Sequence, residues 1–255
     1  MTKVLYANGD SFVFGMECIG DFNKEERNKE LAFSKYIASE LKCETYINNA
    51  YNGATNEFIF RTTLFDLIEL ENSGINPADI FVLVGWTSIN RTEVNGKGFY
   101  DKIPNYRHNE AHLLTSPDAS IEYRDYKTLF INPTAGHFVE FNNKKYDTQD
   151  EILPFCVNYL WADHLQLPQT EAKIIALHTY LKSKGYRHLF INTVESYNFS
   201  RLPESTSFFN LTNSSFYNWA VTNYKNNQRL ANHFDPIPHI EYGKMLVDYI
   251  SRNNV

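Results

Sequence analysis

Short apolar segments alternate with amphipathic segments along most of this chain, and this alternation constrains the fold more than any other feature. The apolar segments are bounded by turn-forming residues and lie at residues 3–7, 44–50, 79–86 and 188–194. Helical patterns, with apolar residues three or four positions apart, lie at residues 29–43, 56–70, 168–184 and 240–251. Short buried strands that alternate with helices favour a parallel sheet covered on both faces, because right-handed crossovers place helices on both sides. The sequence therefore predicts a three-layer α/β/α sandwich around a central parallel sheet of about five strands.

Residues 96–150 interrupt this alternation. Asn, Lys, Tyr and Pro dominate there, and only the segment HFVEF at 137–141 indicates a strand or hairpin. A chain of 255 residues is long enough for one large α/β domain. We therefore interpret residues 1–255 as a single domain with an irregular insertion at about 96–150.

Charge and cysteine content narrow the possible partners and compartments. The net charge of −6 argues against nucleic acid as the main partner, because phosphate binding depends on a surplus of Lys and Arg. The chain has neither an apolar segment of signal-peptide length at its start nor eighteen consecutive apolar residues, so we expect no membrane partner. Cys18, Cys43 and Cys156 are widely spaced and odd in number, which favours reduced thiols in a cytoplasm.

The segment NGDSF at residues 8–12 directly follows the first apolar segment. A tight turn there would hold the hydroxyl of Ser11 at the carboxyl end of a buried strand, which is where ligands bind in parallel sheets. The same letters are also an ordinary turn and helix-cap sequence. Ser11 is thus a candidate nucleophile whose role depends on what else lies at that edge of the sheet.

Other signatures are absent or weak. The chain contains no mid-chain Gly-x-Ser-x-Gly, no Gly-x-x-x-x-Gly-Lys-Ser/Thr and no Gly-x-Gly-x-x-Gly, so we expect neither an α/β-hydrolase elbow nor a nucleotide cofactor. His108 and His112 are four residues apart, but the intervening Glu is not where a zinc protease needs it. We predict no metal and no cofactor.

The order of four blocks, GDSF, NGATN, GWTSINR and DPIPH, resembles the SGNH/GDSL hydrolase superfamily. The resemblance covers both ends of the chain and the first ninety residues. It implies a flavodoxin-like sandwich and a serine esterase, with Ser11 as nucleophile, His239 as base and Asp235 as the acid that orients the base. A serine hydroxyl needs an imidazole to accept its proton, and the imidazole needs a carboxylate to fix its tautomer.

The resemblance also implies an oxyanion hole. Its donors would be the backbone N–H groups of Ser11 and Gly53 together with a side chain from the third block. The family usually has an Asn two residues after the Gly that ends the strand. In this chain Asn90 lies five residues after that Gly, so Asn90 or a hydroxyl of Thr87 or Ser88 would serve. Asn56 either only caps the helix at 57–70 or also contacts the substrate.

The fourth block departs from the family pattern as well. Three residues, rather than two, separate Asp235 from His239, and a proline precedes the histidine. The nearby segment NHFDP contains His233, which is a rival for the base.

These observations predict an enzyme that removes a short acyl group, such as acetyl, from a polar acceptor. The Tyr and Asn content of residues 96–150 suits a carbohydrate-like acceptor, so the expected partner is a small-molecule or carbohydrate ester. Two alternatives remain: a non-catalytic binding or structural module on the same scaffold, or a thioesterase or amidase. NGATNEFIFRTT with GWTSINR also resembles SGNH proteins encoded by bacteriophages, which would place the protein in the host cytoplasm.

Overall fold

Four parallel strands form the central sheet of the computed structural model, which describes residues 2–20, 26–89, 91–95, 128–131, 138–141, 144–147, 163–197, 199–209, 214–229 and 232–255. The strand order is β2-β1-β3-β8, from β1 (Val4–Asn8), β2 (Thr45–Asn48), β3 (Ile80–Trp86) and β8 (Arg187–Asn192). Every pairing in this sheet is parallel. Beyond β8, Phe208 forms only an isolated parallel bridge to Phe190, so the described sheet has four strands rather than about five.

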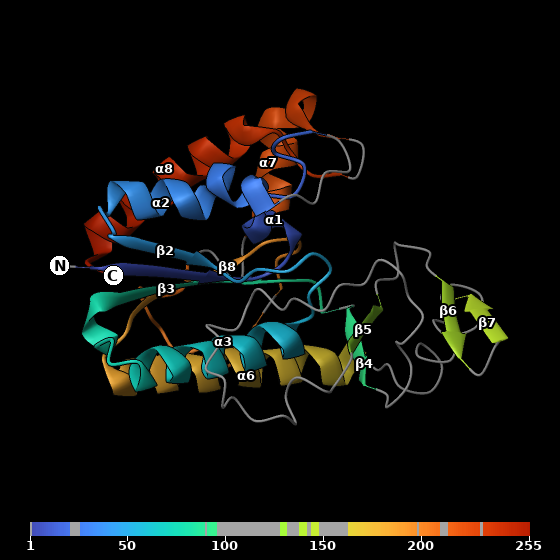
Figure 1. The fold of residues 1–255 in the computed structure, drawn as a ribbon, viewed down its shortest axis with the longest axis horizontal. Helices are drawn as coiled ribbons and strands as arrows, with labels where there is room; N and C mark the ends of the chain where they lie inside the picture. Colours follow the sequence, from blue (N-terminus) through green and yellow to red (C-terminus); the bar gives the residue numbers. More distant parts are fainter. Residues whose placement is uncertain are drawn as a thin grey trace.

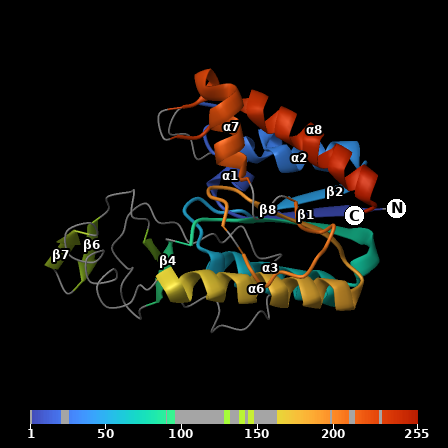
Figure 2. The same ribbon diagram turned by 180° about the vertical axis from the view of Figure 1, so that it is seen from behind.

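Helices cover both faces of the sheet (Figure 1). One face carries α1 (Ser11–Phe14), α2 (Phe33–Glu40), α7 (Phe216–Tyr224) and α8 (Pro236–Asn253). The other face carries α3 (Asn56–Asn72) and α6 (Asp163–Lys184), which lie side by side in both views (Figures 1 and 2). The predicted three-layer α/β/α architecture is confirmed.

The alternation of side chains along β1 shows how this sequence specifies two cores. Leu5 and Ala7 pack into the apolar cluster under α2 and α8, whereas Val4 and Tyr6 pack into the cluster under α3 and α6. Successive residues of a strand point to opposite faces, so a strand covered on both sides must be apolar throughout. All five residues of β1 are buried, which explains the apolar run over its first four residues.

Several helices begin at other residues than the sequence pattern predicts. The pattern at 29–43 divides into a 3₁₀ helix at Glu26–Leu31 and α2. Helix α6 begins five residues before the predicted start and contains Pro168. Helix α8 begins at Pro236 rather than at 240, because Asp235 caps it and proline is favoured in the first helical turn. The sequence did not predict α7, and two further 3₁₀ turns lie at Pro77–Asp79 and Lys225–Asn227.

Two antiparallel pairs come from the middle of the chain. Strand β4 (Thr92–Asn95) pairs with β5 (Thr128–Ile131), and β6 (Phe138–Phe141) pairs with β7 (Lys144–Asp147). The predicted strand or hairpin at 137–141 is therefore confirmed. The remainder of the predicted insertion at 96–150, including His108 and His112, lies outside the described residues.

Strands β1, β3 and β8 end at the same edge of the sheet, and the chain segments that follow them meet there. In the part of the chain that the structure describes, every helix is too short or too polar to span a lipid bilayer. The described ranges also contain no group of three or more His, Cys, Asp or Glu side chains that is arranged to hold a metal ion.

Candidate active site at the carboxyl edge of the sheet

Ser11 lies in the first turn of α1, two residues beyond Gly9, which directly follows β1. Asp10 is the N-cap of this one-turn helix, and its Oδ1 accepts a hydrogen bond of 3.0 Å from the N–H of Phe12. Gly9 makes this sharp turn possible, because a Cβ there would lie 2.4 Å from Cγ2 of Val13. The Gly-Asp-Ser sequence thus fixes Ser11 at the edge where ligands bind in parallel sheets, although the residue is only 4% exposed.

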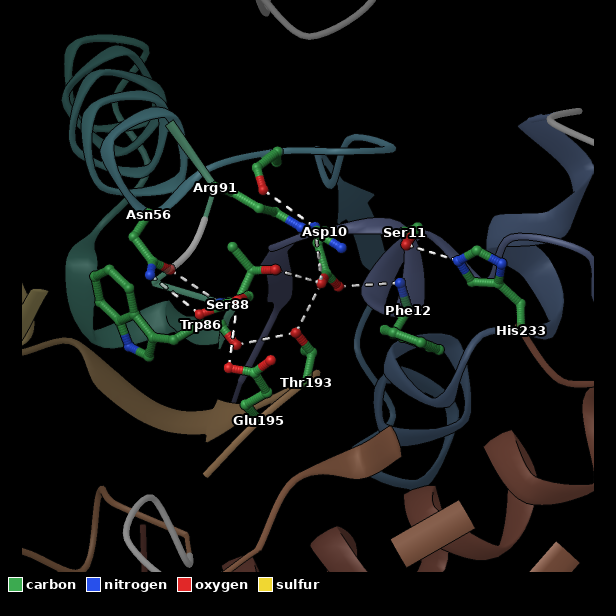
Figure 3. A network of polar contacts seen from close by, with 12 residues as sticks. Asp10, Ser11, Phe12, Asn56, Trp86, Ser88, Arg91, Thr193, Glu195 and His233 are labelled. Atoms are coloured by element: carbon green, nitrogen blue, oxygen red, sulfur yellow. Dashed lines mark hydrogen bonds and ion pairs between the residues drawn. The ribbon is translucent and has the colours of Figure 1, made fainter. Parts of the chain in front are cut away.

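The hydroxyl of Ser11 is hydrogen-bonded to His233. Figure 3 shows this contact, in which Nε2 of His233 lies 2.7 Å from Oγ of Ser11. The imidazole packs against the ring of Phe12, with ring centroids 4.9 Å apart. The backbone carbonyl of His233 accepts a hydrogen bond of 2.7 Å from the N–H of Arg229, which holds the segment before α8 in place. His233 therefore has the position that a base for Ser11 needs.

A buried carboxylate lies on the other side of the same imidazole. Oε2 of Glu17 is 3.4 Å from Nδ1 of His233, and Glu17 is fully buried. This is ion-pair distance, and Nδ1 makes no hydrogen bond within the described residues. Such contacts commonly tighten when a substrate or a charge on the imidazole is present. Ser11, His233 and Glu17 thus have the order of a nucleophile, a base and the acid that orients the base.

The backbone of Glu17 is in an unusual conformation. Its φ angle is +67°, in the left-handed region, which costs a residue with a Cβ about 1–2 kcal/mol. Gly15, at the end of α1, is also left-handed with φ of +79°. Two such residues so close together reverse the chain and bring Glu17 back toward the imidazole. A strained, fully buried carboxylate beside a nucleophile is typical of a functional site.

His239 is not the imidazole at Ser11, and this part of the sequence prediction is wrong. The ring of His239 is fully buried, and it lies nearly parallel to the ring of Phe33 at 5.7 Å. Its Nδ1 accepts a hydrogen bond of 3.4 Å from the N–H of Phe33. Burial, and secondarily the nearby His233, lowers the pKa of His239 to about 3, so the ring is neutral. His239 is therefore a packing residue.

Asp235 is likewise not placed to orient a catalytic base. Its Oδ1 accepts from the N–H of Ile237 at 2.9 Å, and its Oδ2 accepts from Nδ2 of Asn227 at 2.7 Å. These contacts make Asp235 the N-cap of α8, with Pro236 as the first helical residue. The sequence Asp-Pro is a common way to begin a helix, and this signal explains the two residues without catalysis.

Asp10 connects the ends of three neighbouring strands. Its carboxylate is fully buried, and Oδ2 lies within hydrogen-bond or ion-pair distance of Thr87 Oγ1 (2.7 Å), Thr193 Oγ1 (2.9 Å) and Arg91 Nη1 (3.3 Å). Thr87 follows β3 and Thr193 follows β8. Figure 3 shows Arg91 and Thr193 on either side of the Asp10 carboxylate. Because buried charges need such partners, Asp10 holds the turn that carries Ser11 against both loops.

The predicted oxyanion side chains are engaged elsewhere. The hydroxyl of Thr87 donates to Asp10, and the hydroxyl of Ser88 donates to Oε2 of Glu195 at 3.3 Å. A hydroxyl has only one proton, so neither is available for an oxyanion in this arrangement. The amide of Asn56 brackets the backbone of Thr87, donating to its carbonyl at 3.1 Å and accepting from its N–H at 2.9 Å. Asn90 lies outside the described residues.

Gly53 remains a candidate donor. Its φ of +80° is in the region that favours glycine, and a Cβ there would meet no atom within 4 Å. The N–H of Tyr51 donates to the carbonyl of Gly9 at 3.0 Å, which joins this loop to the turn that carries Ser11. Among the described residues, the N–H groups of Gly53 and Ser11 make no backbone hydrogen bond. Both could therefore bind an oxygen of a ligand.

Sequence reasoning missed Glu17, Glu195, Tyr197 and the link between Arg91 and Asp10. Glu17 carries one recognisable signal, since it is the only charged residue in the otherwise apolar segment SFVFGMECIG. Tyr197 contacts Glu195 closely and accepts a hydrogen bond of 2.8 Å from the N–H of Ile89, so it supports the loop after β3. Burial raises the pKa of Tyr197, which keeps its hydroxyl protonated.

Comparisons with known proteins give a partial family match and distant structural likenesses. Residues 20–131 match a family described as "Family of unknown function (DUF6071)", and no curated protein matches the sequence. The structure is similar to a G-D-S-L family protein, described as lipolytic, from Desulfitobacterium hafniense DCB-2, with 10% identity, 97% of this chain and 99% of that chain covered, and a TM-score of 0.40.

A second likeness is to a carbohydrate esterase whose active site is described as having divergent catalytic and non-catalytic binding functions. The identity is 11%, the TM-score is 0.39, and the alignment covers 98% of this chain and 68% of that chain. Both TM-scores are below 0.5, so neither likeness supports a function for this chain.

Proposed function

We propose that this protein is a serine esterase or deacylase that removes a short acyl group, such as acetyl, from a polar, carbohydrate-like acceptor. The observation that carries the proposal is the hydrogen bond of 2.7 Å between Oγ of Ser11 and Nε2 of His233. The carboxylate of Glu17, 3.4 Å from Nδ1 of the same ring, supports it. The order of sequence blocks that resembles the SGNH/GDSL hydrolases agrees with this assignment of the nucleophile.

The reaction begins when Ser11 Oγ attacks the ester carbonyl and gives its proton to Nε2 of His233. Glu17 favours the tautomer with the proton on Nδ1 and then stabilises the charged imidazolium. The N–H groups of Ser11 and Gly53 bind the oxyanion of the tetrahedral intermediate, and one such donor is typically worth about 3–4 kcal/mol.

The second half of the reaction releases both products. His233 gives its proton to the departing alcohol oxygen as the bond between carbon and that oxygen breaks, which leaves an acyl group on Ser11. Water then attacks this acyl-enzyme while His233 again takes a proton. His233 returns this proton to Oγ of Ser11 as the bond between Oγ and the acyl carbon breaks, and the acid is released. No metal or redox group takes part in these steps.

Two features of the chain support a substrate with a small acyl group on a polar acceptor. Residues 96–150 are rich in Tyr and Asn, which suit stacking and hydrogen bonding to a sugar better than contact with a long acyl chain. Ser11 itself is only 4% exposed, which favours a small acyl group over a bulky one.

Replacement of each histidine tests the mechanism. With p-nitrophenyl acetate as substrate, we expect His233→Gln to lower kcat by about 10²–10⁴-fold, the usual contribution of a general base. His239→Gln is the matched control, which should affect thermal stability but leave kcat close to that of the folded wild type.

The opposite ranking of the two histidine variants would contradict this mechanism. A panel of acetyl thioesters and anilides alongside the ester distinguishes an esterase from a thioesterase or amidase. Failure of the wild-type protein to hydrolyse any of them would favour the non-catalytic module.

A further inference from the structure

The proposed oxyanion hole contains two backbone donors. None of the side chains that the sequence predicts as a third donor is available among the residues that the structure describes. Thr87 donates to Asp10, Ser88 donates to Glu195, and the amide of Asn56 is held by the backbone of Thr87. A different side chain from the segment after β3 contacts the residues next to both backbone donors. It belongs to Arg91, whose side chain is 10% exposed.

Arg91 joins the two loops that carry the backbone donors. Its Nη1 donates to Oδ2 of Asp10 at 3.3 Å and to the carbonyl of Ala54 at 3.2 Å. Asp10 is the residue immediately before Ser11, and Ala54 is the residue immediately after Gly53. In Figure 3 the tip of Arg91 reaches Asp10, and Ser11 lies on the other side of Asp10. The guanidinium group therefore lies between the turns that position both N–H donors.

These two contacts leave most of the guanidinium donors for a ligand. The group has five N–H donors, and the two on Nη1 are directed to Asp10 and Ala54. Within the described residues, Nε and Nη2 make no hydrogen bond to the protein. A positive charge with free donors, held rigidly in a largely buried position, is suited to an oxygen that gains negative charge during the reaction.

We infer that Arg91 is a further catalytic residue, whose guanidinium donates to the oxyanion in the role that the SGNH resemblance gives to an Asn side chain. The inference rests on the proposed function. As the bond between Ser11 Oγ and the carbonyl carbon forms, the π electrons move to the carbonyl oxygen, and Arg91 stabilises that charge with the N–H groups of Ser11 and Gly53. When the intermediate collapses, the electrons return and the ester bond breaks.

The interaction with Asp10 allows a purely structural role as well, so the test needs a variant that weakens the Asp10 network and keeps the guanidinium. Thr193→Val is that variant, because Thr193 Oγ1 also lies 2.9 Å from Oδ2 of Asp10 and valine has nearly the same shape. Arg91→Ala removes the guanidinium, and Arg91→Lys keeps a charge that can pair with Asp10 but loses the planar fork.

The experiment measures p-nitrophenyl acetate hydrolysis and thermal unfolding for the full chain and these variants. We expect Arg91→Ala to lower kcat by about 10²–10³-fold with little change in KM, the effect of losing one oxyanion donor. Millimolar guanidinium chloride should restore part of this kcat, whereas sodium chloride at the same concentration should not. Arg91→Lys should lose at least about tenfold in kcat if it replaces only the charge, and Thr193→Val should lose less than Arg91→Ala.

Three results would overturn the role of Arg91: wild-type kcat in Arg91→Lys, a loss in Thr193→Val equal to that in Arg91→Ala, or no rescue by guanidinium. If Arg91→Ala does not fold, the comparison of Arg91→Lys with Thr193→Val decides. Failure of the proposed function is distinguishable, because the wild type would then have no activity that depends on Ser11.

Discussion

Glu17 combines burial with an unusual backbone conformation beside His233. It is fully buried, its φ angle is +67°, and its carboxylate lies 3.4 Å from Nδ1 of His233. Both the burial of a carboxylate and the left-handed backbone cost free energy of folding. A glycine at this position would avoid the backbone cost but would lack the carboxylate that lies beside His233.

We therefore expect Glu17→Gln to lower kcat by about 10²–10⁴-fold with little change in KM, because the amide no longer fixes the tautomer of His233 or stabilises its charged form. Steady-state hydrolysis of p-nitrophenyl acetate measures this effect. Glu17→Asp, which keeps the charge on a shorter side chain, should retain more activity than Glu17→Gln. Equal activity in the wild type and Glu17→Gln would show that Glu17 only fills space.

The sequence predicts the position of Ser11 at the end of β1, but it places His239 rather than its rival His233 beside Ser11 and does not nominate Glu17. The reason is local chemistry. Ser11 follows a buried strand through a turn whose shape its own residues determine, so the prediction needed only neighbouring letters. His233 is 222 positions away, and no local pattern distinguishes it from His239. Glu17 is only six positions from Ser11, but its place depends on a left-handed conformation that glutamate rarely adopts.

Helix α8 shows that a local sequence pattern can also be misread for a whole element. The residues DPIPH were interpreted as a catalytic acid and base, whereas they form the N-cap and first turns of α8. Aspartate and asparagine are both good N-cap residues, but only aspartate carries a charge. Replacing Asp235 therefore separates capping from catalysis.

We expect Asp235→Asn to keep both the thermal stability and kcat close to wild type. Asp235→Ala should lose about 1 kcal/mol in the free energy of unfolding, which corresponds to a decrease in Tm of about 2–4 °C for a chain of this size. Thermal unfolding and ester hydrolysis of the two variants test this. A large loss of kcat in Asp235→Asn would restore Asp235 as the catalytic acid.

The contact between α3 and the sheet contains another buried carboxyl group, that of Asp66. Oδ2 of Asp66 accepts from the hydroxyl of Tyr6 at 2.6 Å and from Nδ2 of Asn49 at 2.8 Å. Burial raises the pKa of Asp66 to about 7, although these hydrogen bonds oppose the shift. The unfolded chain loses this proton near pH 4. Between about pH 4 and pH 7 the folded protein therefore binds a proton that the unfolded chain has lost, and stability decreases as the pH rises.

The variant Asp66→Asn should remove this component, because its amide oxygen accepts the same hydrogen bonds and does not titrate. We expect the Tm of the wild type to fall relative to that of Asp66→Asn as the pH rises from about 4 to about 7. Buried histidines such as His239, whose pKa is lowered to about 3, titrate in both proteins and cancel in the difference. Parallel Tm profiles for the two proteins would contradict the raised pKa.

At the scale of the whole molecule, the strand–helix alternation was enough to predict the layers, because burial on both faces makes parallel strands continuously apolar. It was not enough to predict the edge of the sheet. Among the described residues, only an isolated bridge at Phe208 extends the sheet beyond β8, and an edge of this kind leaves no periodic signal. The carboxylate of Asp10, which joins the loops after β3 and β8 to the turn of Ser11, depends on contacts between distant segments.

This architecture explains how residues from both ends of the chain form one site. The sheet sets the position of Ser11, and Asp10 fixes its turn. The segment that precedes α8 brings His233 to Ser11, the proposed nucleophile, on the face of the sheet where α1 and α8 lie (Figure 1).

The most direct measurement is mass spectrometry of the folded protein after reaction with a fluorophosphonate probe. A serine activated by an imidazole attacks such a probe, whereas an ordinary buried serine does not. We expect one adduct, on Ser11, which is absent in Ser11→Ala and forms far more slowly in His233→Gln. A folded wild-type protein that gains no adduct, or gains it on another residue, would contradict Ser11 and His233 as a catalytic pair.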